Sequence, residues 1–136
     1  MKVLVDTPIW SFALRRRSGR ERESTSSELS SLIQDGRVAM IGPIRQEILS
    51  GIRERPHYER LREQLRSFPD SEITSGDYEE AASFYNRCRT KGIQGSNTDF
   101  LICAIAARNA FPIFTTDQDF THYAGILPIE LYDRTP

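Results

Sequence analysis

The sequence has 136 residues, an ordinary length for one domain, with 38% apolar residues, 27% charged residues and a formal net charge of −1. These values are typical of a soluble globular protein, and no run approaches the roughly 18 apolar residues of a membrane span. Asp6 and Pro8 come too early for a signal peptide. Cys88 and Cys103 lack metal-ligand spacing, so we interpret them as buried thiols. We therefore expect a single cytoplasmic domain over residues 1–136 without a membrane anchor.

Short apolar runs alternate along the chain with helix-like patterns, which predicts an α/β fold with a parallel sheet. The predicted strands are residues 2–5, 37–41, 72–74, 112–115 and 126–131. The predicted helices are residues 8–15 and 22–34, a helix that opens at Gly42 and Pro43, and residues 56–67, 76–91 and 97–110. Segment 97–110 is the most apolar helix, so we expect it to be buried against the sheet. As an assumption, we place strands 2–5 and 112–115 side by side.

Acidic residues stand where the predicted strands and helices meet. Asp6 directly follows the first strand, Asp117 follows strand 112–115, and Glu47 and Asp99 lie near the starts of two helices. Ligands of α/β sheets bind at the carboxyl ends of the strands. If the carboxylates converge there, their mutual repulsion requires a cation. Because the sequence pairs no histidine or cysteine with them, the all-oxygen donor set favours Mg²⁺ or Mn²⁺ over zinc.

Each acid also has a purely structural explanation. Asp6 and Asp117 fit helix or turn caps, Asp99 fits a capping box opened by Ser96, and Glu47 fits a solvent-facing helical position. Taken singly, the structural role is favoured for Glu47 and Asp99 and is as good as the functional role for Asp6 and Asp117. Capping alone does not explain four carboxylates gathered at one place, so the set as a whole indicates a metal site.

The basic residues are unusual because 16 of the 18 are arginine. They form two clusters, one of Arg15, Arg16, Arg17, Arg20 and Arg22, and the other of Arg53, Arg55, Arg60, Arg62 and Arg66. The second cluster alternates with glutamates at ion-pair spacing, so we interpret it as a solvated helix face. The first has fewer nearby acids, and both a solvated face and phosphate contact remain open. Our candidates for nucleic-acid contacts are Arg15, Arg16, Arg17 and Arg45.

Four segments, taken in chain order, resemble the motifs of PIN-domain nucleases. They are Val-Leu-Val-Asp-Thr at 3–7, Arg-Gln-Glu-Ile-Leu at 45–49, Thr-Asp-Phe-Leu-Ile-Cys-Ala at 98–104, and Thr-Thr-Asp-Gln-Asp-Phe at 115–120. The chain length and the first motif close to the N-terminus resemble VapC-type toxins of toxin–antitoxin pairs. The resemblance covers the whole chain, with Phe100 as a mild departure where relatives commonly have alanine or an aliphatic residue.

The resemblance implies a three-layer domain in which helices flank a parallel five-stranded sheet of order 3-2-1-4-5. It also implies Mg²⁺- or Mn²⁺-dependent cleavage of RNA, a homodimer, and inhibition by a small antitoxin protein. The catalytic roles would fall on Asp6, Glu47, Asp99 and Asp117, with Asp6, Asp99 and Asp117 as the metal ligands.

Three residues near these motifs are secondary candidates. Asp119 is an additional acid, and whether it or Asp117 reaches the metal stays open. Thr116 has a hydroxyl suited to holding a phosphate or the attacking water, and Thr7 adjoins Asp6.

Two other functions compete with the nuclease. A haloacid-dehalogenase-like phosphatase would use Asp6 as its nucleophile, but it needs a second aspartate at the position of Pro8, and the only downstream lysine is Lys91. A non-catalytic module that binds nucleic acid or an antitoxin would use the acids only to hold a structural cation. The sequence does not identify the RNA substrate or the number of metal ions.

Overall fold

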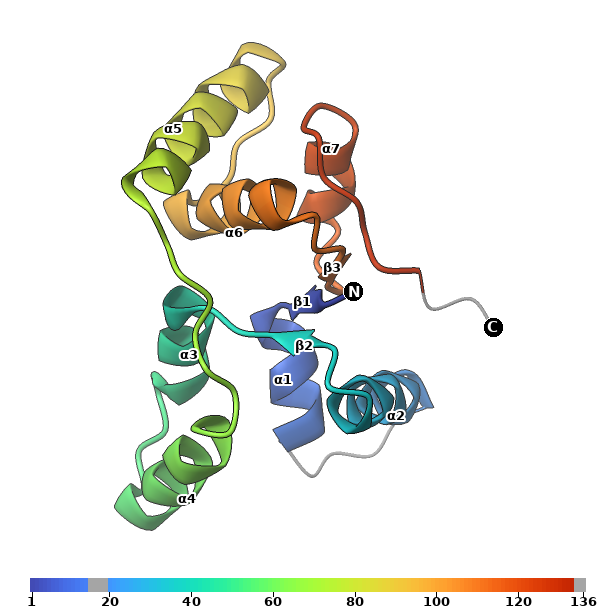
Figure 1. Cartoon of the computed structure of the whole chain (residues 1–136), viewed down its shortest axis with the longest axis vertical. Coiled ribbons are helices and arrows are strands. Elements are labelled where there is room, and N and C mark those ends of the chain that lie inside the picture. The colour runs from blue at the N-terminus through green and yellow to red at the C-terminus, as the bar shows by residue number, and fades with distance from the viewer. Residues whose placement is uncertain (15–19, 134–136) are drawn as a thin grey trace.

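The computed structural model describes residues 1–14 and 20–133, with side chains for 1–14 and 23–133. Strands and helices alternate along the chain (Figure 1). In chain order they are β1 (Val3–Val5), α1 (Thr7–Leu14), α2 (Arg20–Gln34), β2 (Val38–Ala39), α3 (Gly42–Leu49), α4 (Arg55–Leu65), α5 (Ser75–Thr90), α6 (Asn97–Asn109), β3 (Ile113–Phe114) and α7 (Asp119–Ala124). The predicted helices are all found within the described residues, and α7 was not predicted.

The sheet has three parallel strands in the order β2-β1-β3. The assumed pairing of the first strand with the strand near residue 113 is therefore confirmed. The predicted five-stranded sheet is wrong in its strand count, because both outer positions hold only isolated parallel bridges, Met40 with Asp70 and Ile113 with Leu131. Segment 72–74 instead leads into α5, and Pro128, which has no N–H to donate, interrupts segment 126–131.

Helices lie on both sides of the strands. In Figure 1, α5, α6 and α7 lie above the strands, α3 lies to their left, and α2, α4 and most of α1 lie below them. Helix α6 is the most enclosed, since Phe100 to Ala106 are all buried. This confirms the predicted burial of this helix and the parallel α/β class of the fold.

One hydrophobic core joins the strands to the helices around them. It includes all of β1 and β3, the apolar face of α3 and most of α6. Cys88 of α5 and Cys103 of α6 are free, buried thiols, as predicted. Within the described residues, no helix has both the length and the apolar character to cross a membrane.

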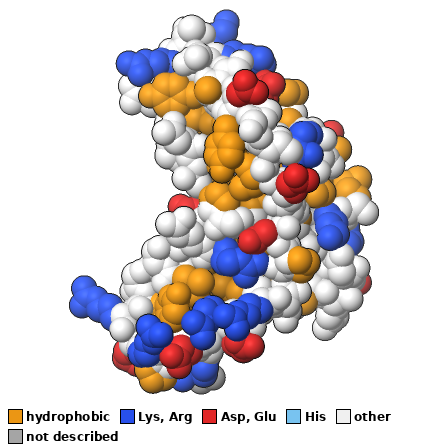
Figure 2. All heavy atoms as spheres, turned by 60° about the vertical axis from the view of Figure 1, so that its left-hand side comes forward, with side chains coloured by type: hydrophobic (Ala, Val, Ile, Leu, Met, Phe, Trp, Pro, Cys, Tyr) orange, Lys and Arg blue, Asp and Glu red, His pale blue; other side chains and the backbone are white. Residues whose placement is uncertain are grey.

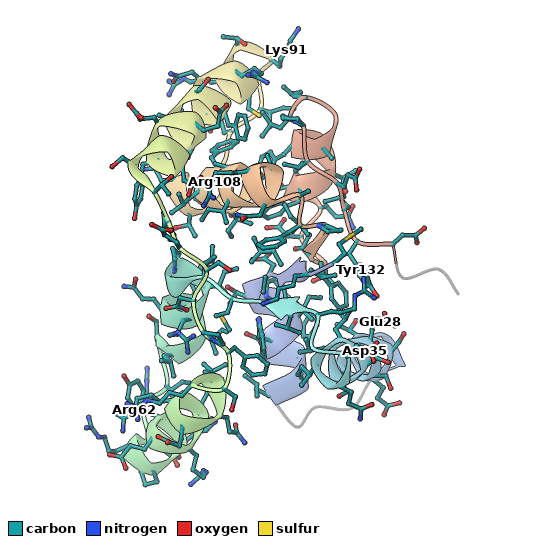
Figure 3. The ribbon with its side chains drawn as sticks, viewed as in Figure 1. Glu28, Asp35, Arg62, Lys91, Arg108 and Tyr132 are labelled. Carbon is teal, nitrogen blue, oxygen red and sulfur yellow. The ribbon has the colours of Figure 1, made fainter. Side chains whose placement is uncertain are left out.

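An ion pair connects the start of α5 to the end of α6. Arg108 Nε donates to Asp77 Oδ1 at 2.7 Å, and its Nη2 donates to Asp77 Oδ2 at 2.9 Å and to the Glu72 carbonyl at 3.0 Å. Arg108 lies where α6 passes the start of α5 (Figure 3). The Asp77 side chain is buried, and the hydrogen bond from Arg108 is the main reason that its pKa is lowered. The pair therefore fixes the end of α6 against the start of α5.

Candidate metal and nuclease site

Asp6 and Asp117 meet because β1 and β3 are adjacent and parallel. The Asp6 N–H donates to the Phe114 carbonyl at 2.9 Å, so both strands end at the same edge of the sheet. Beyond it, Thr115 Oγ1 donates to Asp6 Oδ2 at 2.8 Å and accepts from the Asp117 N–H at 3.0 Å. One hydroxyl group thus joins the two predicted site residues.

Asp99 and Asp119 complete a cluster with Asp117. One carboxylate oxygen from each of these three residues lies within 4.8 Å of the others. Asp99 is brought there by the start of α6, where its N–H donates to Ser96 Oγ at 3.0 Å. The Asp119 N–H donates to Asp117 Oδ1 at 2.9 Å, which holds that carboxylate in place. The structure therefore brings both acids of the fourth motif to Asp99.

Glu47 approaches the same edge from α3. Its Oε1 accepts a hydrogen bond of 3.0 Å from the Thr7 hydroxyl, and the Thr7 N–H donates to Asp6 Oδ1 at 2.8 Å. Thr7 therefore connects Glu47 to Asp6, although the Glu47 side chain is exposed. A pocket of about 480 Å³ opens here, lined by Thr7, Pro43, Gln46, Glu47, Ser50 and Thr98.

Asp6 is held in a strongly unfavourable environment for a carboxylate. It is only 6% exposed, and its pKa is raised to about 6, chiefly by burial. Hydrogen bonds from Thr115 and Thr7 oppose the shift, while the charges of Asp99 and Glu47 add to it. The charges of Asp99 and Glu47 act on Asp6, and those of Asp117 and Asp119 act on Asp99. The four predicted acids therefore share one electrostatic environment.

Asp99 experiences a similar conflict. Burial raises its pKa, hydrogen bonds from Tyr123 and Ser96 lower it, and the charges of Asp117 and Asp119 raise it again. Folding has thus concentrated like charges that repel one another. A cation bound among them would relieve that repulsion.

The donor set fits a hard divalent cation. The clustered side chains are carboxylates, the ligands that Mg²⁺ and Mn²⁺ prefer. The thiol of Cys103 is fully buried, and burial together with the Asp99 and Asp6 charges raises its pKa. A protonated thiol is not a metal ligand, so the site lacks the thiolate that structural zinc centres use.

Sequence reasoning missed two residues that hold the acids. Thr115 contacts Asp6, whereas the sequence points to its neighbour Thr116, whose role stays a prediction. Tyr123 of α7 donates to Asp99 Oδ2 at 2.8 Å. Thr115 belongs to the fourth motif and was within reach of the sequence analysis, but no sequence signal links Tyr123 to Asp99.

The arginine candidates are placed differently from the acids. Arg15, Arg16 and Arg17 lie outside the described residues. Arg45 donates to Asp70 Oδ1 from Nε and Nη2 at 3.0 and 2.8 Å, to the Leu65 carbonyl at 2.9 Å, and to the Phe68 carbonyl. These bonds tie α3 to the chain after α4, so the structure gives Arg45 a stabilising role and no support for phosphate contact.

The residues of the second arginine cluster lie on α4 and just before and after it. Arg55 pairs with Glu59 and Arg66 with Glu63, as expected for a solvated helix face. Figure 2 shows Lys and Arg side chains gathering on the lower part of the molecule, around the height of α4, below a hollow in the outline. Arg53 and Arg60 line a separate pocket of about 940 Å³ between this helix and the end of α1.

Comparisons with known proteins agree with this geometry. Ribonuclease VapC11 of Mycobacterium tuberculosis and VapC ribonuclease Mb1587 of Mycobacterium bovis are each 29% identical over 130 residues, covering 94% of this chain and 96% of theirs. Among solved structures, VapBC2 of Rickettsia felis, bound to a DNA fragment from its promoter, superposes with a TM-score of 0.77 at 16% identity, covering 97% of this chain and 98% of that one. FitAcB of Neisseria gonorrhoeae superposes with a TM-score of 0.71 at 20% identity, covering 96% of each chain.

These solved structures have the same fold as this chain, and the family is shown by a match of the sequence to a family model. The model of the PIN domain family matches residues 3–126, a range that contains all four acidic positions. The chain belongs to the PIN domain family.

Proposed function

We propose that this protein is a Mg²⁺- or Mn²⁺-dependent endoribonuclease that hydrolyses RNA phosphodiester bonds. The observation that carries the proposal is the acidic edge of the sheet, where Asp99, Asp117 and Asp119 cluster and Thr115 links Asp117 to the buried Asp6. The relatives named as VapC ribonucleases support RNA as the substrate.

In this proposal Asp6, Asp99 and Asp117 hold the cation, and Asp119 reinforces the set. A bound divalent cation polarises a phosphate oxygen, lowers the pKa of water and stabilises the leaving oxygen. Glu47, exposed beside the pocket and bonded to Thr7, orients the attacking water. The hydrogen bonds from Thr115 and Thr7 favour the charged form of Asp6 and partly offset the rise in its pKa that burial causes, which favours its use as a ligand.

The proposal also includes an antitoxin partner, a homodimer and a cytoplasmic location. The solved neighbours VapBC2 and FitAcB are complexes, which supports a small antitoxin protein as the partner of this chain. We further propose that residues 1–136 form one domain that pairs as a homodimer in the cytoplasm. The two free, buried cysteines are compatible with a reducing compartment.

The decisive experiment is cleavage of total cellular RNA by the purified protein, followed by sequencing of the new ends. Discrete cuts are expected with Mg²⁺ or Mn²⁺ and none with a chelator. Asp6→Asn and Asp99→Asn should each lower the cleavage rate at least 100-fold, because each removes a charged ligand. Glu79→Gln removes an exposed carboxylate from α5, away from the site, and should cut as the parent protein does.

Two results would overturn the nuclease assignment. Full cleavage by both aspartate variants would show that the acids are not the catalytic centre. Tight cation binding with no cleavage of any RNA offered would favour a binding module whose acids hold a structural ion.

A further inference from the structure

Asp99 is held differently from the aspartate at the equivalent position of the neighbouring helix. Helix α5 starts with a complete capping box, in which Asp77 Oδ2 accepts from the Thr74 N–H at 2.9 Å while Thr74 Oγ1 accepts from the Asp77 N–H. Helix α6 repeats only half of it: Ser96 Oγ accepts from the Asp99 N–H. Within the described residues, the Ser96 N–H does not donate to the Asp99 carboxylate, so the capping box is incomplete, and this carboxylate interacts instead with the side chains of Ser96 and Tyr123.

The partner of the Asp99 carboxylate from outside its own helix is Tyr123. Its hydroxyl donates to Asp99 Oδ2 at 2.8 Å from the last turn of α7. The ring is fully buried and packs against Phe100 at 5.0 Å and Phe120 at 5.2 Å between ring centroids. A buried phenol needs a hydrogen-bond acceptor, and a fixed ring gives its hydroxyl a fixed position. Tyr123 is therefore a rigid donor aimed at one oxygen of Asp99.

Gly95 leaves the space that this arrangement needs. A Cβ atom at Gly95 would lie 2.2 Å from the Tyr123 hydroxyl oxygen and 3.0 Å from a ring carbon of Phe100. The backbone of Gly95 does not have a positive φ, so the absent side chain matters here for space and not for conformation. A glycine at this point lets the hydroxyl reach Asp99.

We propose that Tyr123 is a positioning residue that holds the Asp99 carboxylate toward Asp117 and Asp119, so that the three acids bind a divalent cation. The inference rests on the proposed function and deepens it by adding a residue outside the acidic motifs. Groups that hydrogen-bond to metal ligands fix the orientation of those ligands, and their loss typically costs about 10- to 100-fold in metal affinity or activity.

The test is direct titration of the purified protein with Mn²⁺, read by electron paramagnetic resonance or calorimetry without RNA. Tyr123→Phe keeps the ring and removes the hydroxyl, so the fold should survive. We expect the dissociation constant for Mn²⁺ to rise by about 10-fold and kcat for RNA to fall while KM changes little.

The matched control is Tyr132→Phe. The Tyr132 hydroxyl also donates to a carboxylate, that of Glu28 in α2, and both residues are labelled in Figure 3. Removing this hydroxyl should leave the Mn²⁺ affinity unchanged, because Glu28 is not part of the acidic cluster.

A second variant, Gly95→Ala, tests the hydrogen bond between Tyr123 and Asp99 by filling the space beside the Tyr123 hydroxyl. Gly95→Ala forces the Tyr123 hydroxyl to move, so it should weaken Mn²⁺ binding in the parent protein. In a Tyr123→Phe background the 2.2 Å contact with the hydroxyl oxygen is gone, and only the contacts of 2.9 and 3.0 Å with the ring carbons at position 123 and of Phe100 remain. The added effect of Gly95→Ala should therefore be smaller, which a double-mutant cycle measures.

Each outcome separates this inference from the proposed function. Mn²⁺ affinity equal to that of the parent in Tyr123→Phe would overturn the positioning role even if RNA is cut. If Tyr123→Phe binds Mn²⁺ more weakly than the parent protein, and the parent protein cuts no RNA, the positioning role is upheld and the nuclease is rejected. A parent protein that binds no Mn²⁺ would overturn both.

Discussion

At the scale of single residues, the site depends on which hydroxyl faces Asp6. Thr115 and Thr116 are adjacent in the fourth motif, and side chains alternate in direction along an extended segment. Strand β3 has only two residues, so the pattern of apolar residues does not fix which threonine points toward the acids. The structure assigns the contact to Thr115, whose hydroxyl serves both Asp6 and the Asp117 N–H.

This assignment predicts different effects for two isosteric substitutions. Thr115→Val removes the donor to Asp6 Oδ2 and the acceptor for the Asp117 N–H, so kcat for RNA cleavage should fall by about 10-fold or more. Thr116→Val, one residue along, breaks neither bond and should have the smaller effect. Steady-state kinetics on a defined RNA oligonucleotide compares them. Full activity of Thr115→Val alongside a large loss in Thr116→Val would return the role to Thr116.

At the scale of elements, the starts of helices were predictable but the partners of their side chains were not. Thr74 and Ser96 each stand three residues before an aspartate, and each caps its helix in the structure. What the two carboxylates contact depends on residues distant in sequence, Arg108 for Asp77 and Tyr123 for Asp99. Local sequence therefore predicted the Ser96 cap and singled out Asp99, whereas it assigned Thr74 to a strand and did not single out Asp77. For neither acid did it decide between a structural and a functional role.

The α5–α6 ion pair predicts a pH-dependent contribution to stability. The folded-state pKa of Asp77 is lowered from 3.8, so the charged form is favoured in the folded protein. The stabilisation is present above pH 4 and is lost as pH falls through the folded-state pKa, which lies lower still. Asp77→Asn should reduce the free energy of unfolding by roughly 1–3 kcal/mol at pH 7, and the difference from the parent should shrink toward pH 3.

Urea denaturation at a series of pH values measures this difference. Glu80→Gln, which removes an exposed charge from the same helix, is the matched control and should change little. A deficit in Asp77→Asn that stays constant from pH 7 to pH 3 would mean that the charge of Asp77 does not stabilise the α5–α6 packing.

At the scale of the whole molecule, the centre of the sheet was predictable and its edges were not. Strand β1 is a continuous buried run, the assumption that strands 2–5 and 112–115 are neighbours is correct, and the family resemblance implied β2 on the other side of β1. The outer positions carry Pro128 on one side and the approach to the Thr74 cap on the other, and each forms a single bridge in place of a strand. Helix α7 was missed because six residues give too short a pattern to recognise, yet it supplies Tyr123.

A bound cation should stabilise the entire fold, because its proposed ligands come from distant parts of the chain. Folding brings Asp6, Asp99, Asp117 and Asp119 together, and the unfolded chain does not, so a divalent cation binds the folded state preferentially. At a concentration of about 100 times its dissociation constant, a cation adds about 2.7 kcal/mol, which raises Tm by several degrees for a domain of this size.

Thermal melts with Mn²⁺, matched in ionic strength with a monovalent salt, measure the effect. The parent protein and Glu79→Gln should gain the same increase in Tm, while Asp99→Asn, which lacks one carboxylate of the cluster, should gain far less. Because Asp99→Asn keeps the side-chain size and an oxygen that can accept from Tyr123, a lost response would reflect the charge of the site and not a damaged fold. An equal increase in Tm in Asp99→Asn would place the stabilising cation elsewhere on the molecule.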